Sequence, residues 1–456
     1  MAKYKAYPQY KDSGVEWLGE IPLSWDMWKL SHAYEVIGSG TTPTSNNESW
    51  FQGNILWVTT GELRETVIYN TSKNISLQTL QSFPALKVHP VGSIIIAMYG
   101  ATIGRLGILG VDATTNQACC AMTKSNVINN KYLYYWLQTF RMEIINLSSG
   151  GGQPNINKEK VASLKISSPS IKDQILIAAF LDHETTKIDN LIEKQQQLIE
   201  LLKEKRQAVI SNAVTKGLNP DVPMKDSGVE WLGEVPEHWS YTRIKYVSLL
   251  NPSKSKLTYD NINECTFLPM EKLKNNSVIT DENRLIKDVI NGYTYFKDGD
   301  LLVAKVTPCF ENKNIAIAKN LTNAIGFGSS EIYVIRTNKY IDVDYLLYRL
   351  QENNFMCAAT GAMIGAGGLK RIPSDFLLNY QIVIPPKNEM KQISEYLINQ
   401  ENQYNALENQ AIIGIQLLQE RRTALISAAV TGKIDVRNWV APGEQAKAES
   451  PAEAFA

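Results

Sequence analysis

The stretch KDSGVEWLGEIPLSW at residues 11–25 decides the fold, because it returns as KDSGVEWLGEVPEHW at residues 225–239. The offset between the two copies is 225 − 11 = 214 residues. A second block, LLKEKRQAVIS at residues 201–211, returns as LLQERRTALIS at residues 417–427, at an offset of 417 − 201 = 216 residues. Two blocks that repeat at nearly one spacing indicate an internal duplication, so the chain consists of two halves built on one frame.

The sequence between these blocks differs strongly between the halves. Residues 41–157 and 252–370 share only a faint skeleton, of which residues 92–97 and 299–304 are the clearest parts. A duplicated enzyme would be expected to keep its chemical groups in both copies. A duplicated reader of two different targets would keep the frame and vary the interior, which is the pattern in this chain.

Each half is predicted to end in a long helix, because apolar residues follow heptad spacing through residues 171–216 and 387–433. Polar side chains at the seam positions Gln195, Lys205 and Arg421 indicate that the two helices cover each other incompletely, so a partner could cover the rest. The residues predicted to pack against the other helix or against a partner are Leu181, Ile188, Leu191, Leu198, Leu202, Leu397, Leu407, Leu418 and Leu425.

Short apolar runs bounded by glycine predict mixed sheets in the interior of each half. We therefore expect an α+β fold of two domains joined by the two long helices. The expected boundaries are residues 1–170 for the first domain, 171–216 for the central helix, 217–386 for the second domain and 387–433 for the C-terminal helix. The remaining residues, 434–456, are rich in Ala, Glu and Pro and are predicted to be disordered.

Composition places the chain among globular proteins, with 44% hydrophobic and 20% charged residues. It has no uncharged apolar run of about 18 residues, no recognisable signal peptide and no C-x-x-C pair, so a cytoplasmic location is expected. The formal net charge of +0 differs from the basic excess of most free-standing DNA binders. It favours either a protein that does not bind nucleic acid or one that binds it together with partners.

The motifs that carry common chemistry are missing from the sequence. The four histidines are scattered and do not pair with cysteines or carboxylates at metal-ligand spacing. The glycine-rich stretches at residues 150–152 and 361–368 match neither the phosphate-loop nor the dinucleotide-binding pattern. The chain is therefore predicted not to be an enzyme, with no catalytic residues and no metal.

The repeated block, the YGATIGR motif at residues 99–105 and the GGQPNIN loop at residues 151–157 resemble the specificity subunits of type I restriction–modification systems. The likeness spans about residues 8–435. It implies two target-recognition domains, each reading one half of a split, asymmetric site in double-stranded DNA. It also implies that the long helices form an antiparallel coiled coil with pseudo-twofold symmetry.

The resemblance further implies a scaffold on which two methyltransferase subunits dock and which restriction and translocase subunits can join. Catalysis and S-adenosylmethionine binding would belong to those partners, so no cofactor is expected on this chain. Partners would also supply much of the phosphate contact, which fits the neutral charge. The alternative is a coiled-coil interaction protein whose two variable domains bind other proteins; a recognition portion of a fused restriction–methyltransferase enzyme is a third reading.

In the first half, polar residues on predicted turns are the candidates for DNA contact. Asn and Gln can bond adenine bidentately, and Arg105 suits a phosphate or a guanine. The alternatives are a solvated glycine-rich turn at residues 151–157, a surface salt bridge for Arg105 and simple turn formation at residues 59–62. The candidates are Thr59, Thr60, Glu62, Thr102, Arg105, Gln153, Asn155, Asn157 and Lys158.

The second half departs from this pattern, because TPCF at residues 307–310 stands where the first half has TIGR, and the loop at residues 365–371 lacks Gln-Pro-Asn. Contacts therefore cannot be copied from one half to the other, and basic groups near turns are the best candidates. Residues 254–256 could equally form an exposed loop. The candidates are Lys254, Lys256, Lys305, Asn312, Lys313, Lys370 and Arg371.

Overall fold

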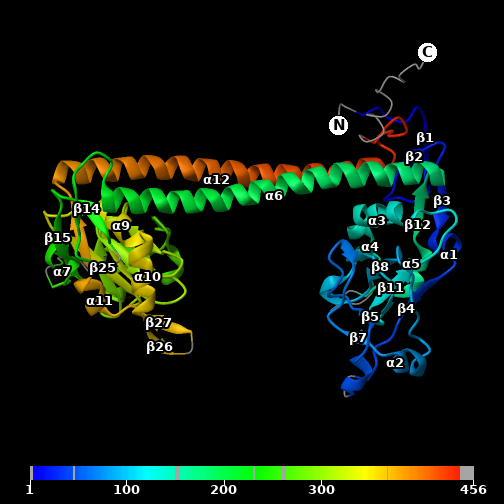
Figure 1. The fold of residues 1–456 in the computed structure, drawn as a ribbon, viewed down its shortest axis with the longest axis horizontal. Helices are drawn as coiled ribbons and strands as arrows, with labels where there is room; N and C mark the ends of the chain where they lie inside the picture. Colours follow the sequence, from blue (N-terminus) through cyan, green and yellow to red (C-terminus); the bar gives the residue numbers. More distant parts are fainter. Residues whose placement is uncertain are drawn as a thin grey trace, which may run out of the picture. The chain divides into compact units, whose positions relative to one another are not determined.

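A computed structural model describes residues 4–44, 47–148, 155–229, 232–255, 257, 263–366 and 368–441. The predicted tail therefore lies largely outside the described residues. The chain divides into two compact units: unit 1 comprises Met1–Gln195 and Ile413–Ala456, and unit 2 comprises Gln196–Ile412. Both long helices, α6 (Ile171–Lys216) and α12 (Lys387–Val430), contribute a segment to each unit (Figure 1).

The centre of unit 1 is a five-stranded sheet in the order β4-β11-β8-β9-β6, beside a three-stranded sheet in the order β10-β5-β7. Strand β8 reads Ile-Ile-Ile-Ala and is buried along its whole length, as expected for a continuous apolar run in the middle of a sheet. The elements of unit 1 before α6 are β1 (Tyr10–Asp12), β2 (Glu20–Pro22), β3 (Asp26–Lys29), α1 (Leu30–Ala33), β4 (Ile37–Ser39), η1 (Glu48–Phe51), β5 (Ile55–Val58), β6 (Thr66–Ile68), β7 (Asn74–Ile75), α2 (Leu77–Ser82), β8 (Ile94–Ala97), η2 (Gly100–Thr102), β9 (Leu106–Leu109), β10 (Ala113–Thr115), β11 (Cys119–Met122), α3 (Asn130–Thr139), α4 (Arg141–Asn146), α5 (Lys158–Ser163) and β12 (Lys165–Ser168).

Unit 2 has two four-stranded sheets, in the orders β16-β25-β22-β23 and β20-β17-β24-β21. Strand β22 takes the place of β8 and is likewise buried throughout. The elements between α6 and α12 are β13 (Met224–Asp226), β14 (Glu234–Pro236), β15 (Ser240–Arg243), α7 (Ile244–Val247), β16 (Ser248–Leu250), β17 (Glu264–Leu268), η3 (Met270–Lys272), β18 (Leu273–Lys274), β19 (Ser277–Val278), β20 (Asn283–Leu285), α8 (Ile286–Val289), β21 (Thr294–Lys297), β22 (Leu301–Ala304), β23 (Ile315–Ile317), η4 (Thr322–Ala324), β24 (Ile325–Gly328), β25 (Ile332–Thr337), α9 (Val343–Gln351), α10 (Asn353–Gly361), β26 (Ile364–Ala366), β27 (Leu369–Arg371), α11 (Ser374–Asn379) and β28 (Gln381–Ile384).

The repeated block forms the same small frame in both units. In unit 1, β1 pairs with β2 and β3 pairs with β12, all antiparallel. In unit 2, β13 pairs with β14 and β15 pairs with β28 in the same way. Trp25 and Trp239 lie in the two cores with 0% and 1% exposure, so these frame tryptophans pack within the protein. The predicted α+β fold of two mixed-sheet domains joined by packed long helices is confirmed.

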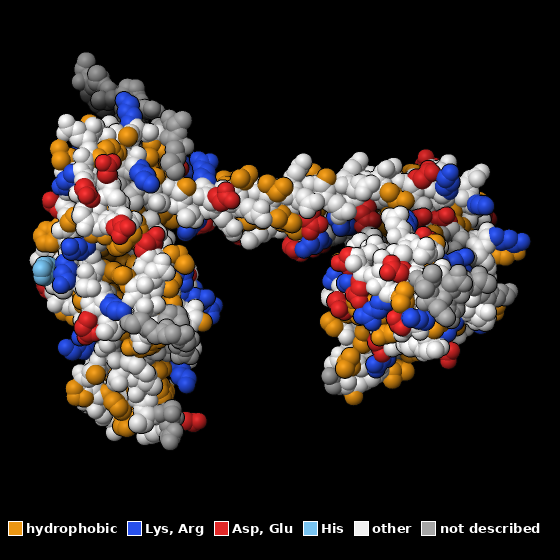
Figure 2. All heavy atoms as spheres, turned by 180° about the vertical axis from the view of Figure 1, so that it is seen from behind, with side chains coloured by type: hydrophobic (Ala, Val, Ile, Leu, Met, Phe, Trp, Pro, Cys, Tyr) orange, Lys and Arg blue, Asp and Glu red, His pale blue; other side chains and the backbone are white. Residues whose placement is uncertain are grey.

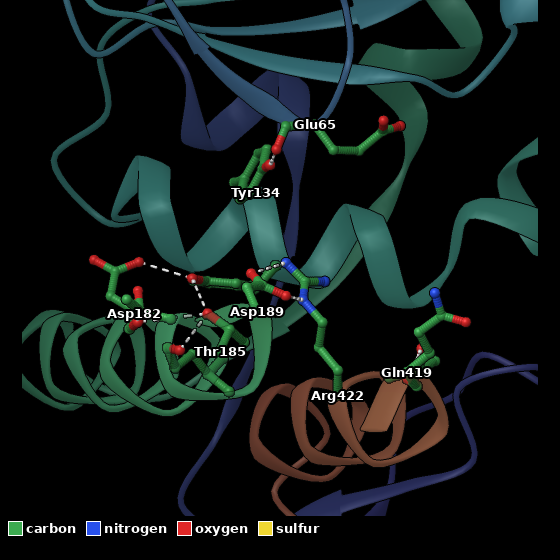
Figure 3. Close-up of polar contacts among 11 residues, drawn as sticks. Glu65, Tyr134, Asp182, Thr185, Asp189, Gln419 and Arg422 are labelled. Carbon is green, nitrogen blue, oxygen red and sulfur yellow. Dashed lines mark hydrogen bonds and ion pairs between the residues drawn. The ribbon is translucent and has the colours of Figure 1, made fainter. Parts of the chain in front are cut away.

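The two long helices pack against each other within each unit. In unit 1 the Arg422 guanidinium of α12 donates to Asp189 of α6 at 2.9 Å (Figure 3). In unit 2 Arg206 of α6 donates to Glu408 of α12 at 3.2 Å. The later residue of α6, Arg206, pairs with the earlier residue of α12, Glu408, so the two helices run antiparallel.

Most of the predicted seam residues lie on the packed faces of these helices. The buried or half-buried ones are Leu181, Ile188, Leu202, Leu397, Leu418 and Leu425. Leu191, Leu198 and Leu407 do not lie on these packed faces, because they are 47%, 42% and 47% exposed. For these three residues, contact with a partner stays a prediction. In the middle of α6 the half-buried positions are Ile192 and Ile199, one residue further along, which turns Leu191 and Leu198 outward. On α12, Glu408 is half-buried instead of Leu407, because it pairs with Arg206.

A buried tyrosine ties each domain to the end of a long helix. The Tyr132 hydroxyl on α3 lies 2.8 Å from Ser167 O on β12 and 3.2 Å from Val430 O at the end of α12. The Tyr345 hydroxyl on α9 lies 3.0 Å from Val383 O on β28 and 3.1 Å from Val214 O near the end of α6. The last carbonyls of a helix lack partners within the helix, so each tyrosine satisfies one of them.

The glycines just after the two long helices allow the helix ends to lie close to the repeated block. Gly217 and Gly432 have φ values of +79° and +71°, the left-handed conformation common after a helix C-terminus. A Cβ on Gly432 would lie 2.3 Å from Pro22 Cγ, and one on Gly217 would lie 3.3 Å from Trp239. Both helices therefore end against the repeated block. Among the described residues, no helix is long and apolar enough to cross a membrane.

We predict that Tyr345→Phe lowers the free energy of unfolding by about 1–3 kcal/mol, because it removes the donor from two buried carbonyl oxygens. Denaturant unfolding measures this change. Tyr340→Phe is the matched control, since Tyr340 is 62% exposed and should change stability very little. Equal stability of the two variants would contradict the role given to the Tyr345 hydroxyl.

Candidate nucleic-acid interface

In both units the strand at the centre of the main sheet leads into a turn that pairs with the segment before a short helix. In unit 1, Tyr99 forms an isolated antiparallel bridge with Asn155, and Ile156 N donates to Met98 O at 2.9 Å. We call residues 99–105 and 155–158 edge 1. It unites the turn after β8 with the segment that leads into α5.

Unit 2 repeats this arrangement with unlike side chains. Val306 forms an isolated antiparallel bridge with Arg371, and Ile372 N donates to Lys305 O at 2.9 Å. We call residues 305–312, 364–366 and 368–371 edge 2, which unites the turn after β22 with the hairpin before α11. Both edges are formed by backbone hydrogen bonds, so the same position in the frame carries different chemistry in the two units.

Edge 1 contains five of the candidate residues from the first half. Thr102 and Arg105 are half-buried, and Arg105 N donates to Thr102 O at 3.0 Å within the turn. Asn155 and Lys158 are exposed. The Asn157 side-chain oxygen caps α5 by accepting from Lys160 N at 2.9 Å, which leaves its amide nitrogen to donate elsewhere. Gln153 lies outside the described residues.

The other candidates of the first half lie on a different turn, after β5. The Glu62 carboxylate accepts from Thr59 N at 2.8 Å, from Thr59 Oγ1 at 2.6 Å and from Ser72 Oγ at 2.7 Å. Burial raises the pKa of Glu62, but the hydrogen bonds from Thr59 and Ser72 outweigh it and lower the pKa below its ordinary value. This arrangement favours the turn-forming alternative for Thr59 and Glu62, and Thr60 is half-buried beside them.

Edge 2 is held together by Thr307. Its backbone N donates to Lys370 O at 3.0 Å, its hydroxyl donates to Gly368 O at 2.6 Å, and the hydroxyl oxygen accepts from Lys370 N at 3.0 Å. These bonds fix the hairpin of β26 and β27 against the turn after β22. Figure 1 shows the hairpin projecting from unit 2 on the side away from the long helices.

Cationic side chains surround the base of this hairpin. Arg371 forms a two-point ion pair with Glu331, at 2.8 and 3.0 Å. The hydrogen bond from Arg371 lowers the pKa of Glu331, although burial acts in the opposite direction. Lys305 Nζ lies 5.1 Å from the centroid of the Tyr333 ring. Lys370 is exposed, and so is Asn312 in the adjacent turn. Edge 2 therefore offers more positive than negative charge.

Two of the predicted lysines are engaged inside unit 2. Lys313 Nζ donates to Gln207 Oε1 and, at 3.2 Å, to Gln351 O, and burial lowers the pKa of Lys313. Lys254 Nζ donates to the Ile290 carbonyl. Both ammonium groups satisfy acceptors of the protein, so we leave them out of the interface proposed below. Lys256 lies outside the described residues.

Sequence reasoning missed the apolar surface of the hairpin at edge 2. Ile364 and Leu369 are 70% and 56% exposed. The signal was present, because Gly367 and Gly368 stand between the apolar stretch at residues 362–366 and Leu369, and a glycine pair of this kind is a hairpin signal. No group of three or more His, Cys, Asp or Glu side chains that could hold a metal ion occurs among the described residues.

Comparison with known proteins identifies related sequences along most of the chain. A family model described as the type I restriction modification DNA specificity domain matches residues 22–202. The EcoAI specificity subunit of Escherichia coli is 33% identical over 41% of this chain, which spans only 32% of that relative's length. The MjaVIII specificity subunit of Methanocaldococcus jannaschii is 22% identical over 92% of this chain and 95% of its own length.

Solved structures share the fold. A chain from a study described as the structural basis of complex assembly and conformational transition of the type I R-M system has a TM-score of 0.69 at 16% identity, covering 91% of this chain and 99% of that chain. The HsdS subunit from Thermoanaerobacter tengcongensis has a TM-score of 0.55 at 15% identity, covering 91% of this chain and 98% of its own.

We predict that Lys313→Met lowers the free energy of unfolding by about 1–3 kcal/mol, because Gln207 and Gln351 lose a half-buried hydrogen-bond donor. Lys305→Met is the matched control on the same turn and should change stability by less than about 0.5 kcal/mol. Denaturant unfolding measures the stability of both variants. If Lys305→Met were destabilised and Lys313→Met were not, the internal structural role that we assign to Lys313 would be wrong.

Proposed function

This chain belongs to the family of type I restriction–modification specificity subunits, and we propose that its two domains read the two unlike parts of a split DNA target. The observation that carries the proposal is the pair of edges. Edge 1 and edge 2 occupy the same position in the repeated frame, yet their side chains differ. Edge 1 presents two asparagine amides, an arginine and a lysine, whereas edge 2 presents one asparagine amide, two lysines, an arginine and exposed apolar groups. Equivalent positions with unlike chemistry suit the reading of unlike base sequences.

The side chains at each edge match known modes of base recognition. Amides such as Asn155 can bond the N6 and N7 edge of adenine, and arginines such as Arg105 can bond guanine or phosphate. At edge 2, Lys305 and Lys370 provide cations for the phosphate backbone, whereas the Arg371 guanidinium is paired with Glu331. We infer an asymmetric target, because the two edges offer different donors, acceptors and apolar groups.

The long helices are proposed to dock the partner subunits. Their exposed faces carry apolar side chains, and Figure 2 shows hydrophobic side chains exposed along the helices. On α6 these include Leu191, Leu198 and Leu201, at 47%, 42% and 61% exposure; on α12 they include Leu407 and Leu417, at 47% and 59%. Exposed apolar surface of this kind marks protein contact sites. We propose that methyltransferase subunits cover it and that restriction and translocase subunits join the assembly.

In this proposal the chain contributes specificity and the partners contribute chemistry. S-adenosylmethionine would bind the methyltransferase subunits, so the chain itself would hold no cofactor. The neutral net charge of the chain also supports a shared interface, because phosphate contacts supply a large part of DNA affinity and partners can provide them.

The direct test is modification-sensitive sequencing of a host that carries this chain together with a methyltransferase subunit. We expect methylated adenine within a motif of two unlike blocks separated by unspecified bases, because two unlike edges read the target. A host with the methyltransferase subunit alone is the control. An active, purified complex that leaves no such motif would support the alternative of a coiled-coil interaction protein instead.

A second test measures the charge contribution of edge 2. We predict that Lys370→Gln, in the complex with the methyltransferase subunit, reduces the slope of log K against log salt concentration by about 0.9, the value for one lost phosphate contact. Lys339→Gln is the control, because residue 339 follows β25 at the end opposite to Ile332, which pairs with Ala304 beside edge 2. Identical slopes for both variants would remove Lys370 from the interface.

A further inference from the structure

The hairpin at edge 2 has one apolar face that the rest of the protein leaves exposed. Its register pairs Ile364 with Arg371 and Ala366 with Leu369. Because side chains alternate along a strand, Ile364, Ala366, Leu369 and Arg371 share one face, and Gly365 and Lys370 share the other. All six residues are exposed, and neither Ile364 nor Leu369 belongs to a hydrophobic cluster of the described residues.

The apolar face is nevertheless held in a defined position. A two-stranded ribbon is only marginally stable in water by itself. Here Thr307 bonds both Gly368 and Lys370, and Arg371 is anchored to Glu331. Gly365 allows the strands to approach closely, since a Cβ there would lie 2.3 Å from Leu369 O. A ribbon fixed at its base, with aliphatic groups exposed, is arranged to contact something outside the chain.

The surroundings of this face favour duplex DNA over a protein partner. Lys370 projects from the opposite face, and Lys305 lies at the base beside the Arg371–Glu331 ion pair, so two lysines flank the ribbon. The major groove of B-DNA, about 12 Å wide, admits a two-stranded β-ribbon, whereas the minor groove is about 6 Å wide. The apolar group that base pairs display in the major groove is the 5-methyl group of thymine.

We propose that the face formed by Ile364, Ala366 and Leu369 reads thymine by contact with its 5-methyl group in the major groove. The inference rests on the proposed function and makes it specific: the half-site read by unit 2 contains at least one thymine whose methyl group contributes to recognition. Edge 1, with its amides, reads its half-site by hydrogen bonds instead.

The test replaces each thymine of the methylated target, one at a time, by deoxyuridine, which removes the methyl group alone. The complex of the full chain with the methyltransferase subunit is titrated with each duplex. We expect at least one replacement to weaken binding about fourfold, the value for one buried methyl group. Ile364→Ser and Leu369→Ser should then bind the thymine and deoxyuridine duplexes equally at that position.

Leu249→Ser is the matched control, because Leu249 is 56% exposed on β16 and should keep the discrimination of the original chain. The proposal is overturned if no thymine of the target is sensitive to deoxyuridine, or if both hairpin variants keep the discrimination. It is also overturned if the only effect of the variants is a loss of DNA bending, because that result indicates a wedge in the minor groove. A loss of binding to the methyltransferase subunit alone overturns it as well, because that result indicates a protein contact. Absence of specific binding by the unchanged complex would instead refute the proposed function.

Discussion

Each domain of this protein is completed by the C-terminal end of the long helix from the other half of the sequence. Tyr132 reaches the Val430 carbonyl of α12, and Tyr345 reaches the Val214 carbonyl of α6. The same helix ends contribute apolar side chains to the two main cores. Neither half of the sequence therefore fills its own core, and the antiparallel packing of α6 and α12 is a requirement of both domains as well as a link between them.

This constraint explains why the frame repeats while the interiors diverge. The frame must preserve the tyrosines, the helix-ending glycines and the tryptophan block, because both cores depend on them. The edges are joined to that frame through backbone atoms, with Ile156 N donating to Met98 O and Ile372 N donating to Lys305 O. Backbone pairing places few demands on side chains. Residues at the edges can therefore change with the target while the position of each edge in its domain stays the same.

The sequence reveals the parts of this structure that are periodic or repeated, and much less of what depends on distant partners. The duplication and both long helices follow directly from block spacing and heptads. It is harder to predict which residues face the seam, because Leu191 and Leu198 are each followed by an isoleucine that suits a packed position equally well. The roles of Glu62 and Lys313 depend on groups 10 and 106 residues away in sequence, at Ser72 and Gln207. Composition alone cannot show that a charged side chain is already paired.

Pairing inside the protein also limits how this chain can bind DNA. In unit 2, Lys254 and Lys313 donate to acceptors of the domain, and Arg371 shares its charge with Glu331. A chain of zero net charge with several cations already engaged has little electrostatic attraction of its own for a duplex. Affinity would then come mainly from the assembled complex, and the edges would contribute discrimination between bases. Apolar contact with a base suits that division, because it distinguishes sequences without adding charge.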